Sequence, residues 1–120
     1  MADTGETCTV WFNPKCSKCR ATRDLLAERE QPATYVEYLQ QAPSRSELVR
    51  VMGLLGIGDP REMMRTGEAV YAELGLAAAD GDRLLDAMVE HPILIERPIV
   101  IRGDRAVIAR PPEKVLDLLG

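Results

Sequence analysis

The sequence lacks the features of a secreted, membrane-spanning or nucleic-acid-binding protein. Its 120 residues contain no apolar run of the length that crosses a bilayer. The first ten residues, MADTGETCTV, have neither the basic region nor the apolar region of a secretory signal. Acidic residues outnumber basic ones by 19 to 15, a formal net charge of −4, whereas nucleic-acid-binding domains carry an excess of basic residues. We therefore expect a cytoplasmic protein that binds neither membranes nor nucleic acid.

Cysteine and histidine are also scarce, with three cysteines and one histidine in the chain. A small, odd number of cysteines is not a secreted disulfide framework, and in the reducing cytoplasm paired cysteines are redox-active or metal-binding. A closed zinc site needs four ligands, and beyond Cys16 and Cys19 only Cys8 and His91 are available. Cys8 is expected in the core because it lies in an apolar run, and His91 is expected at a helix terminus. We therefore expect no bound metal and no bound cofactor.

Repeats, low-complexity tracts and linkers are absent as well, so we expect one domain over residues 1–120. An apolar fraction of 46% is enough to form a core in a chain of this length. The first third of the chain predicts a strand over Cys8–Phe12, a helix from about Cys16 to Glu30 and a second strand over Ala33–Leu39. This order of elements has the length of a βαβ unit.

The middle of the chain, about residues 42–92, contains helix signals and no strand signal, which indicates a helical insertion. The segment SRSE at residues 44–47 is a capping box, and the helix that follows it should extend through Met52. In DPRE, at residues 59–62, an aspartate N-cap precedes a proline at the first helical position. A third helix is predicted over Asp82–Glu90, with its apolar residues on one side.

Strand signals return in RPIVIRGDRAVIA, where two β-rich runs meet at a Gly-Asp pair typical of a hairpin turn. The last residues, RPPEKVLDLLG, predict a helix that begins at two prolines. The order is therefore β-α-β, helices, β-β-α. It indicates an α/β fold with a mixed four-stranded sheet and helices packed on it.

The turn between the first strand and the first helix, in WFNPKCSKCRAT, holds two of the three cysteines. Cys16 and Cys19 are three residues apart on the first helical turn, where Cβ atoms lie about 5–6 Å apart, within reach of a disulfide. Thiols at a helix N-terminus ionise more readily, because unpaired N–H groups and the helix dipole favour the thiolate. Basic residues are unfavourable at this end of a helix unless an anion is present, yet four surround the thiols: Lys15, Lys18, Arg20 and Arg23. The pattern favours redox or nucleophilic chemistry over a zinc half-site or inert packing.

Three segments of the chain resemble the ArsC-type arsenate reductases of bacteria, in particular the short arsenate reductase-related branch of that family. They are FNPKCSKCRATRDLL, HPILIERPIVI and ARPPEKVLDLL, and the resemblance extends over about residues 7–119. It implies a thioredoxin-like fold for the predicted sheet and helices. It also implies an activity, in which Cys16 attacks arsenate with loss of water. A thiol such as glutathione then attacks the adduct, and glutaredoxin resolves the mixed disulfide as arsenite is released.

The same resemblance implies a set of site residues. Arg65, Arg97 and Arg110 correspond to the arginines that bind the oxyanion, and guanidinium forks suit the oxygens of such an anion. Arg20, in the turn itself, is a further candidate ligand of the oxyanion. Pro98 corresponds to the cis-proline that this fold places beside the thiol.

Two positions depart from the family pattern. Phe12 stands where the family has a histidine that helps to keep the thiol ionised, so ionisation of Cys16 is expected to depend on the helix end, Lys18, Arg20 and nearby arginines. Cys19 stands where serine or another small residue is usual, and it offers an internal resolving thiol. A Cys16–Cys19 disulfide formed in this way would be reduced by thioredoxin or glutaredoxin.

Two other functions stay open from the sequence. One is a general thiol-disulfide oxidoreductase without an oxyanion substrate. The other is a redox-sensing regulator like the Spx proteins, which share the fold and the C-x-x-C and bind RNA polymerase. The set of three arginines favours an oxyanion site over both. We therefore predict a monomeric, thiol-dependent arsenate reductase whose partners are arsenate, or a similar oxyanion, and glutaredoxin or thioredoxin.

Overall fold

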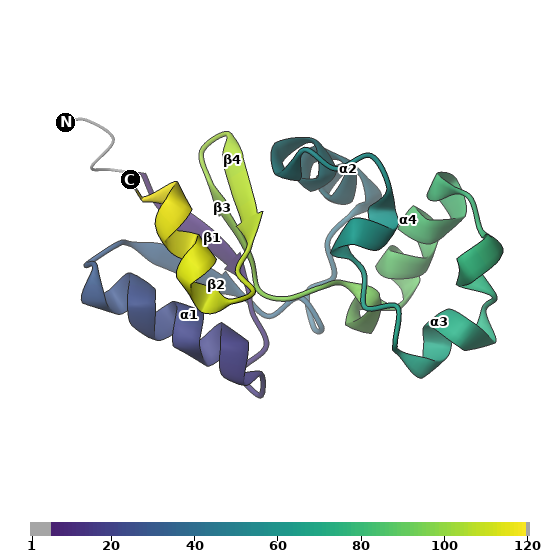
Figure 1. Ribbon diagram of the computed structural model, residues 1–120, viewed down its shortest axis with the longest axis horizontal. Helices are drawn as coiled ribbons and strands as arrows, with labels where there is room; N and C mark the ends of the chain where they lie inside the picture. Colours follow the sequence, from purple (N-terminus) through teal and green to yellow (C-terminus); the bar gives the residue numbers. More distant parts are fainter. Residues whose placement is uncertain (1–5, 120) are drawn as a thin grey trace. The chain divides into compact units, whose positions relative to one another are not determined.

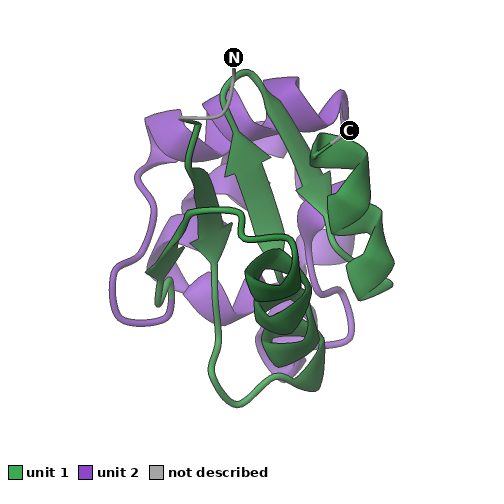
Figure 2. Ribbon diagram, turned by 90° about the vertical axis from the view of Figure 1, so that its left-hand side faces the viewer, with its two compact units in different colours: residues 1–38, 97–120 green, residues 39–96 purple. Residues whose placement is uncertain are grey.

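The computed structural model describes residues 6–119. The chain divides into two compact units, residues 1–38 with 97–120 and residues 39–96 (Figure 2). The first unit holds all four strands and the cysteine turn, and the second is helical. That residues 1–120 form one domain with a helical insertion stays a prediction.

The first unit is built on a mixed four-stranded sheet, as the sequence predicted (Figure 1). The strand order is β2-β1-β3-β4, with β1 parallel to β2 and antiparallel to β3, and β3 antiparallel to β4. Helix α1 (Ser17–Glu28) connects β1 to β2, as a parallel pair requires. The strands are β1 (Cys8–Trp11), β2 (Ala33–Val36), β3 (Ile99–Arg102) and β4 (Arg105–Ile108).

The core of this unit lies between one face of the sheet and two helical segments. Side chains alternate along a strand, so Cys8, Val10 and Phe12 share the face that packs with α1 and with the 3₁₀ helix Pro112–Leu118. The register sets Val10 opposite Val100 on β3, on the same face. The helical segments contribute mainly Cys19, Leu26, Val115 and Leu118. Both cysteines of the turn, Cys16 and Cys19, therefore belong to the edge of this core.

The hairpin between β3 and β4 turns at Gly103-Asp104, as predicted, and Gly103 has a left-handed φ of 62°. The element after β4 is a 3₁₀ helix instead of the α-helix expected from the sequence. Arginines of the hairpin bond to its last carbonyls: Arg102 Nη1 lies 3.1 Å from the oxygen of Leu118, and Arg105 Nη2 lies 2.6 Å from that of Asp117. These bonds satisfy helix-end carbonyls that have no partner within the helix.

The second unit contains α2 (Arg45–Leu55), α3 (Ala69–Glu73) and α4 (Gly81–Glu90), joined by short 3₁₀ turns. The capping box at Ser44 is confirmed, because its side chain accepts the N–H of Glu47 while the Glu47 carboxylate accepts the N–H of Ser44. Asp59 and Pro60 begin a 3₁₀ helix, Pro60–Met63, where the sequence suggested a helix start. Helix α3 was not predicted.

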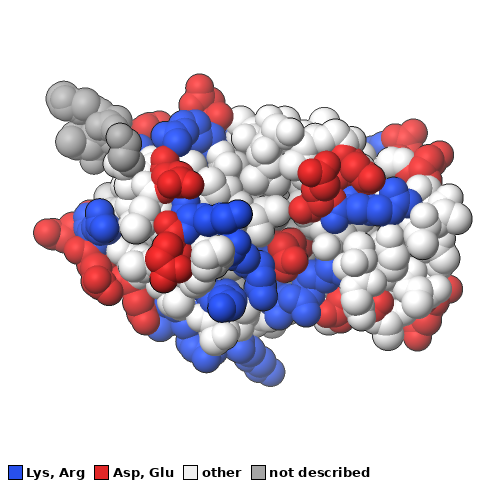
Figure 3. Space-filling view, in the orientation of Figure 1, with Lys and Arg blue, Asp and Glu red and all other residues white. Residues whose placement is uncertain are grey.

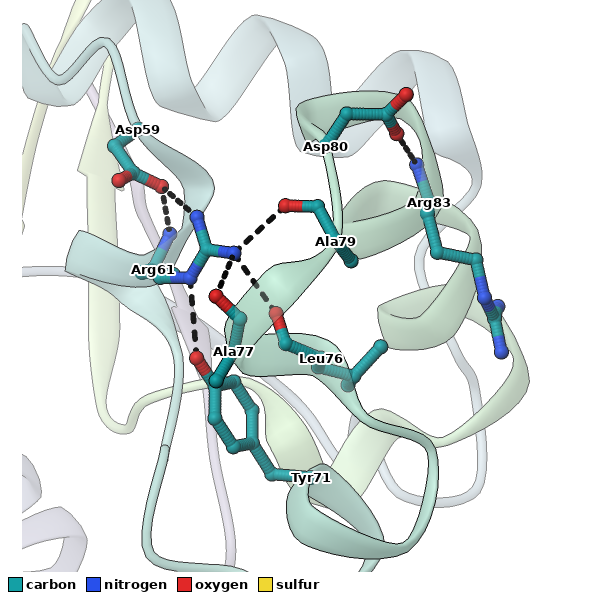
Figure 4. Close-up of polar contacts among 8 residues, drawn as sticks. All are labelled: Asp59, Arg61, Tyr71, Leu76, Ala77, Ala79, Asp80 and Arg83. Atoms are coloured by element: carbon teal, nitrogen blue, oxygen red, sulfur yellow. Dashed lines mark hydrogen bonds and ion pairs between the residues drawn. The ribbon is translucent and has the colours of Figure 1, made fainter.

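Arg61 organises the second unit through its guanidinium group (Figure 4). It donates to the hydroxyl of Tyr71 at 3.1 Å and to three carbonyl oxygens, at 2.8, 3.1 and 2.7 Å, that belong to Leu76, Ala77 and Ala79. The side chain therefore holds the segment after α3 against the Pro60–Met63 turn. Among residues 6–119, no helix combines the length and the apolar character needed to cross a membrane.

Candidate functional site

The turn that carries the cysteines is shaped by Asn13. Its backbone carbonyl accepts the N–H of Cys16 at 3.0 Å, and its side-chain oxygen accepts the N–H of Lys15 at 3.0 Å. Arg20 reaches back from the helix and donates from Nη1 to the carbonyl of Pro14 at 2.9 Å. A short asparagine side chain that bonds two residues ahead is a common way to close such a turn. Asn13 was expected only to end the strand, so its part in building the site was missed.

The helix begins at Ser17, which makes Cys16 the N-cap residue and Cys19 the third residue of the helix. Both cysteines are free thiols in the structure. Cys16 is 8% exposed and Cys19 is 0% exposed, so Cys16 is the more accessible of the two residues. The N-cap position places the Cys16 side chain beside the unpaired N–H groups of the first helical turn.

The pKa of Cys16 lies below its ordinary value, although burial by itself would raise it. Hydrogen bonding from the backbone N–H and the thiol of Cys19 and from the backbone N–H of Lys18 favours the thiolate, and so does the charge of Arg110. These contributions together outweigh desolvation. Cys16 is therefore the cysteine that ionises first.

Cys19 behaves in the opposite way. Burial raises its pKa, and the negative charge of a Cys16 thiolate raises it further, to about 12. The backbone of Asn13 and the charge of Arg110 oppose this increase and do not overcome it. When Cys16 ionises, the turn holds a thiolate beside a neutral thiol, that of Cys19, which donates to it.

Arg110 and Arg97, two of the predicted oxyanion ligands, meet in the first unit. Arg110 donates from Nη1 to the backbone carbonyl of Arg97 at 2.8 Å. The Arg97–Pro98 peptide bond is cis, and the Arg110–Pro111 bond, for which the sequence raised no such expectation, is cis as well. Both arginines are half-buried, and the charge of Arg110 acts on both thiols of the turn.

Arg65, the third predicted oxyanion ligand, belongs to the second unit and is held there by carboxylates. Its Nε and Nη2 atoms both lie 2.9 Å from one carboxylate oxygen of Glu68. Its Nη1 atom lies 3.9 Å from a carboxylate oxygen of Glu96. Neither glutamate was expected from the sequence as a partner of Arg65, although oppositely charged side chains three residues apart, such as Arg65 and Glu68, often meet.

The basic residues of the turn lie at the surface of the first unit. Lys15, Lys18, Arg20 and Arg23 are all exposed, and Figure 3 shows lysine and arginine side chains gathered where α1 begins in Figure 1. Of the groups expected to ionise Cys16, Lys18 contributes through its backbone N–H and Arg110 through its charge, and a contribution of Arg20 stays a prediction. Arg20 bonds within the turn.

Phe12, which stands at the position of the family's histidine, packs in an aromatic cluster. Its ring meets that of Tyr35 edge-on, with centroids 5.1 Å apart, and the guanidinium of Arg23 lies 6.0 Å from its centroid. His91 lies at the C-terminal end of α4, as expected, where its backbone N–H donates to the backbone carbonyl of Ala87. Residues 6–119 bring no three histidine, cysteine, aspartate or glutamate side chains into a group that could hold a metal ion.

Comparisons with known proteins identify relatives over most of the chain. The model of the ArsC family matches residues 11–118. An arsenate reductase of Haemophilus influenzae is 46% identical over 112 residues, covering 92% of this chain and 97% of the relative. An arsenate reductase of Neisseria meningitidis serogroup A is 44% identical over 108 residues, covering 88% and 92%. The solved structure of an arsenate reductase from Vibrio cholerae superimposes with a TM-score of 0.90 at 43% identity, covering 93% of this chain and 97% of that one.

The structural likeness confirms the predicted thioredoxin-like α/β fold, and the cysteine turn lies within the matched residues. The family match and the identity of more than two fifths over most of the chain lead to one conclusion. The chain belongs to the ArsC family.

Proposed function

We propose that this protein reduces arsenate to arsenite at the expense of thiols, with Cys16 as the nucleophile. The observation that carries the proposal is the lowered pKa of the Cys16 thiol at the N-cap of α1, in a chain of the ArsC family. The thiolate is the nucleophilic form of cysteine. A thiol such as Cys16, which ionises readily and is 8% exposed, is therefore suited to attack a substrate. The relatives' names as arsenate reductases support arsenate as the substrate.

In the first step the sulfur of Cys16 bonds to arsenic, and one arsenate oxygen takes up two protons and leaves as water. Arsenic remains at the +5 oxidation state. Arg97 and Arg110, with Arg20 and Arg65, are proposed to bind the other oxygens, because guanidinium groups donate to tetrahedral oxyanions in pairs of hydrogen bonds.

In the second step Cys19 is proposed to attack the sulfur of Cys16. The S–S bond forms, the S–As bond breaks, and its electron pair reduces arsenic to the +3 state of arsenite. Formation of the adduct removes the charge of Cys16, which in the free protein raises the pKa of Cys19. The pKa of Cys19 therefore falls once the arsenic adduct of Cys16 has formed. At that stage the Cys19 thiolate is needed for attack on the Cys16 sulfur, as in thiol–disulfide exchange.

In the third step an external thiol reduces the Cys16–Cys19 disulfide. Because Cys19 is 0% exposed and Cys16 is 8% exposed, the incoming thiolate attacks the sulfur of Cys16, and Cys19 leaves as a thiolate. The second thiol of the donor then attacks the donor sulfur of this mixed disulfide, so that Cys16 is released as a thiolate and the donor leaves as a disulfide. Thioredoxin or glutaredoxin is the proposed donor. Direct attack of glutathione on the arsenic adduct is the alternative that does not use Cys19.

The proposal is tested by measuring arsenite after the reduced protein is incubated with arsenate and either donor system. The wild type should produce arsenite and Cys16→Ser should not, because no other residue can replace the attacking thiolate. Cys8→Ser is the matched control, since Cys8 is a buried cysteine of β1 whose pKa is raised by burial. Full turnover by Cys16→Ser would show that the mechanism is wrong.

The C-x-x-C turn also favours a second function, thiol-disulfide exchange without an oxyanion. In that case the wild type would reduce a model disulfide and produce no arsenite. Absence of both activities, with binding of purified RNA polymerase, would favour an Spx-like regulator.

A further inference from the structure

The ion pair between Arg65 and Glu68 is closer and more specific than surface ion pairs usually are. Nε and Nη2 form one edge of the guanidinium plane, and both lie 2.9 Å from the same oxygen of Glu68. The side chains of Arg65 and Glu68 are 26% and 24% exposed, so the pair is partly buried but still accessible to solvent. Charge-assisted hydrogen bonds of this length restrict the orientation of an arginine more than a long-range attraction does.

Glu68 is also in an unusual place for a glutamate. It is the N-cap residue of α3, a position at which serine, threonine, aspartate and asparagine are preferred. Its side chain makes no capping hydrogen bond to the helix. The carboxylate is directed to Arg65 instead of to the free N–H groups of its own helix. A residue that breaks a local rule in this way has a role elsewhere.

The backbone around Arg65 is fixed as well. The N–H of Arg65 donates to the carbonyl of Leu94 at 2.7 Å, and the N–H of Glu68 donates to the carbonyl of Arg65 at 3.2 Å. Met64 forms a bridge with Ile95. Main chain and side chain together leave Arg65 little freedom.

The other edge of the guanidinium, formed by Nη1 and Nη2, is less firmly engaged. Nη2 is shared with the edge that contacts Glu68, and the ion-pair partner of Nη1 is Glu96 at 3.9 Å, which is beyond hydrogen-bond distance. A tetrahedral oxyanion that binds this edge would replace a weak contact and leave the contact with Glu68 intact.

We propose that Glu68 is a positioning residue for Arg65, holding one edge of its guanidinium so that the opposite edge binds the oxyanion substrate. This inference rests on the proposed function. Glu68 does not touch the substrate and acts through Arg65. The negative charge of Glu68 weakens the attraction of Arg65 for an anion. Glu68 therefore orients the guanidinium group but lowers its electrostatic attraction for the oxyanion.

The test is a double-mutant cycle on the KM for arsenate. Glu68→Ala should raise KM about three- to tenfold and leave kcat within about twofold, because ground-state binding is lost and the chemistry at Cys16 is not. Glu68→Gln keeps an oxygen that accepts from Nε and Nη2 and removes the charge, so its KM should equal or fall below that of the wild type. In an Arg65→Ala background, Glu68→Ala should change KM no further.

Glu73→Ala is the matched control, because Glu73 is an exposed glutamate at the other end of α3. It removes the same charge and should leave KM unchanged. The inference is overturned if Glu68→Ala leaves KM unchanged, if it raises KM equally in the Arg65→Ala background, or if Glu68→Gln binds as weakly as Glu68→Ala.

Failure of the proposed function has a different signature, because the wild type itself would then produce no arsenite. In that case arsenate binding is measured by calorimetry. Weaker binding by Glu68→Ala than by the wild type supports the inference. No binding by the wild type, or equal binding by the two proteins, overturns it.

Discussion

Cys16 and Cys19 are separated by one turn of α1 and differ in both exposure and acidity. Cys16 is 8% exposed with a lowered pKa, and Cys19 is 0% exposed with a pKa raised to about 12. The acidity of each cysteine depends in part on the other, because the Cys19 thiol donates to the Cys16 thiolate and the thiolate disfavours ionisation of Cys19. The pair therefore has a defined order of reaction before any substrate binds.

Replacement of Arg110 should raise the pKa of Cys16. The positive charge of Arg110 favours the thiolate, so in Arg110→Gln the sulfur holds its proton to higher pH. The pH profile of Cys16 alkylation, followed by mass spectrometry, should shift upward, while Arg110→Lys should lie nearer the wild type. Lys114→Gln, which removes an exposed positive charge from the last helical segment, should leave the profile in place. A profile for Arg110→Gln equal to that of the wild type would contradict this account.

Cys19→Ser should separate the two routes of arsenite release. A serine hydroxyl can still donate to the Cys16 thiolate but cannot form a disulfide with it. With thioredoxin as the only donor, turnover should therefore be lost while alkylation of Cys16 keeps its pH profile. Unchanged turnover under these conditions would show that Cys19 does not resolve the adduct.

The sequence was sufficient to select Cys16 and Cys19 as candidates from their residue type and spacing, and the three arginines were selected from the family resemblance. The sequence was not sufficient to show which positive charge acts on the thiols. Four basic residues adjoin the cysteines in sequence, yet Arg110, more than ninety positions away, is the one that acts on both sulfurs. Side-chain direction depends on the fold, and for that reason Asn13 and Glu68 were also missed.

Among the elements, those with strong local signals were predicted best. The two β-rich runs that form β3 and β4, the turn at Gly103 and the Ser44 capping box all agree with the structure. Helix α3 was missed because it has five residues and a glutamate N-cap, so neither length nor capping identified it. The segment after Pro111 forms a tighter helix than its sequence indicated.

Helix α2 should depend on its capping box. Ser44→Ala removes the acceptor for the N–H of Glu47 and should lower the free energy of unfolding by about 1 kcal/mol. Ser44→Asp supplies another good N-cap acceptor and should recover most of this loss. Urea denaturation of the three proteins measures the difference. Equal midpoints for Ser44→Ala and the wild type would show that the cap does not stabilise α2.

The β3–β4 hairpin should depend on the left-handed conformation of Gly103. Gly103→Ala should cost about 1–2 kcal/mol, because an L-residue is strained at this φ. Its Cβ would also meet the Glu6 carboxylate. Gly103→Asn adds the same Cβ but tolerates the conformation better, so it should be less destabilising in thermal unfolding. The reverse order of the two variants would contradict the role assigned to the backbone.

For the molecule as a whole, the residues predicted to bind or attack the oxyanion are divided between the two compact units. The cysteines, Arg20, Arg97 and Arg110 belong to the first unit, and Arg65 belongs to the second. The second unit is held together in part by Arg61. Its guanidinium donates to three backbone carbonyl oxygens in the segment that follows α3. Stability of the second unit and acidity of the thiols therefore have separate causes.

Arg61→Ala should loosen the second unit and leave the thiols unchanged. Loss of the guanidinium removes the donors to Leu76, Ala77 and Ala79, so amide hydrogen exchange should accelerate in residues 59–79. Exchange in β1 and β3 and the alkylation profile of Cys16 should stay as in the wild type. Arg83→Ala, which removes only a 3.7 Å ion pair with Glu90, is the control. Equal acceleration in both units would show that they open together.

Titration of Cys16 in the wild-type protein tests the central claim most directly. The rate of its alkylation by iodoacetamide is measured against pH, with the modified residue identified by mass spectrometry. We predict that Cys16 reacts first, with a midpoint below that of an unperturbed cysteine, while Cys19 and Cys8 stay unmodified over the same range. A midpoint at or above that of an unperturbed cysteine, or a Cys16 sulfur that iodoacetamide cannot reach, would contradict the account.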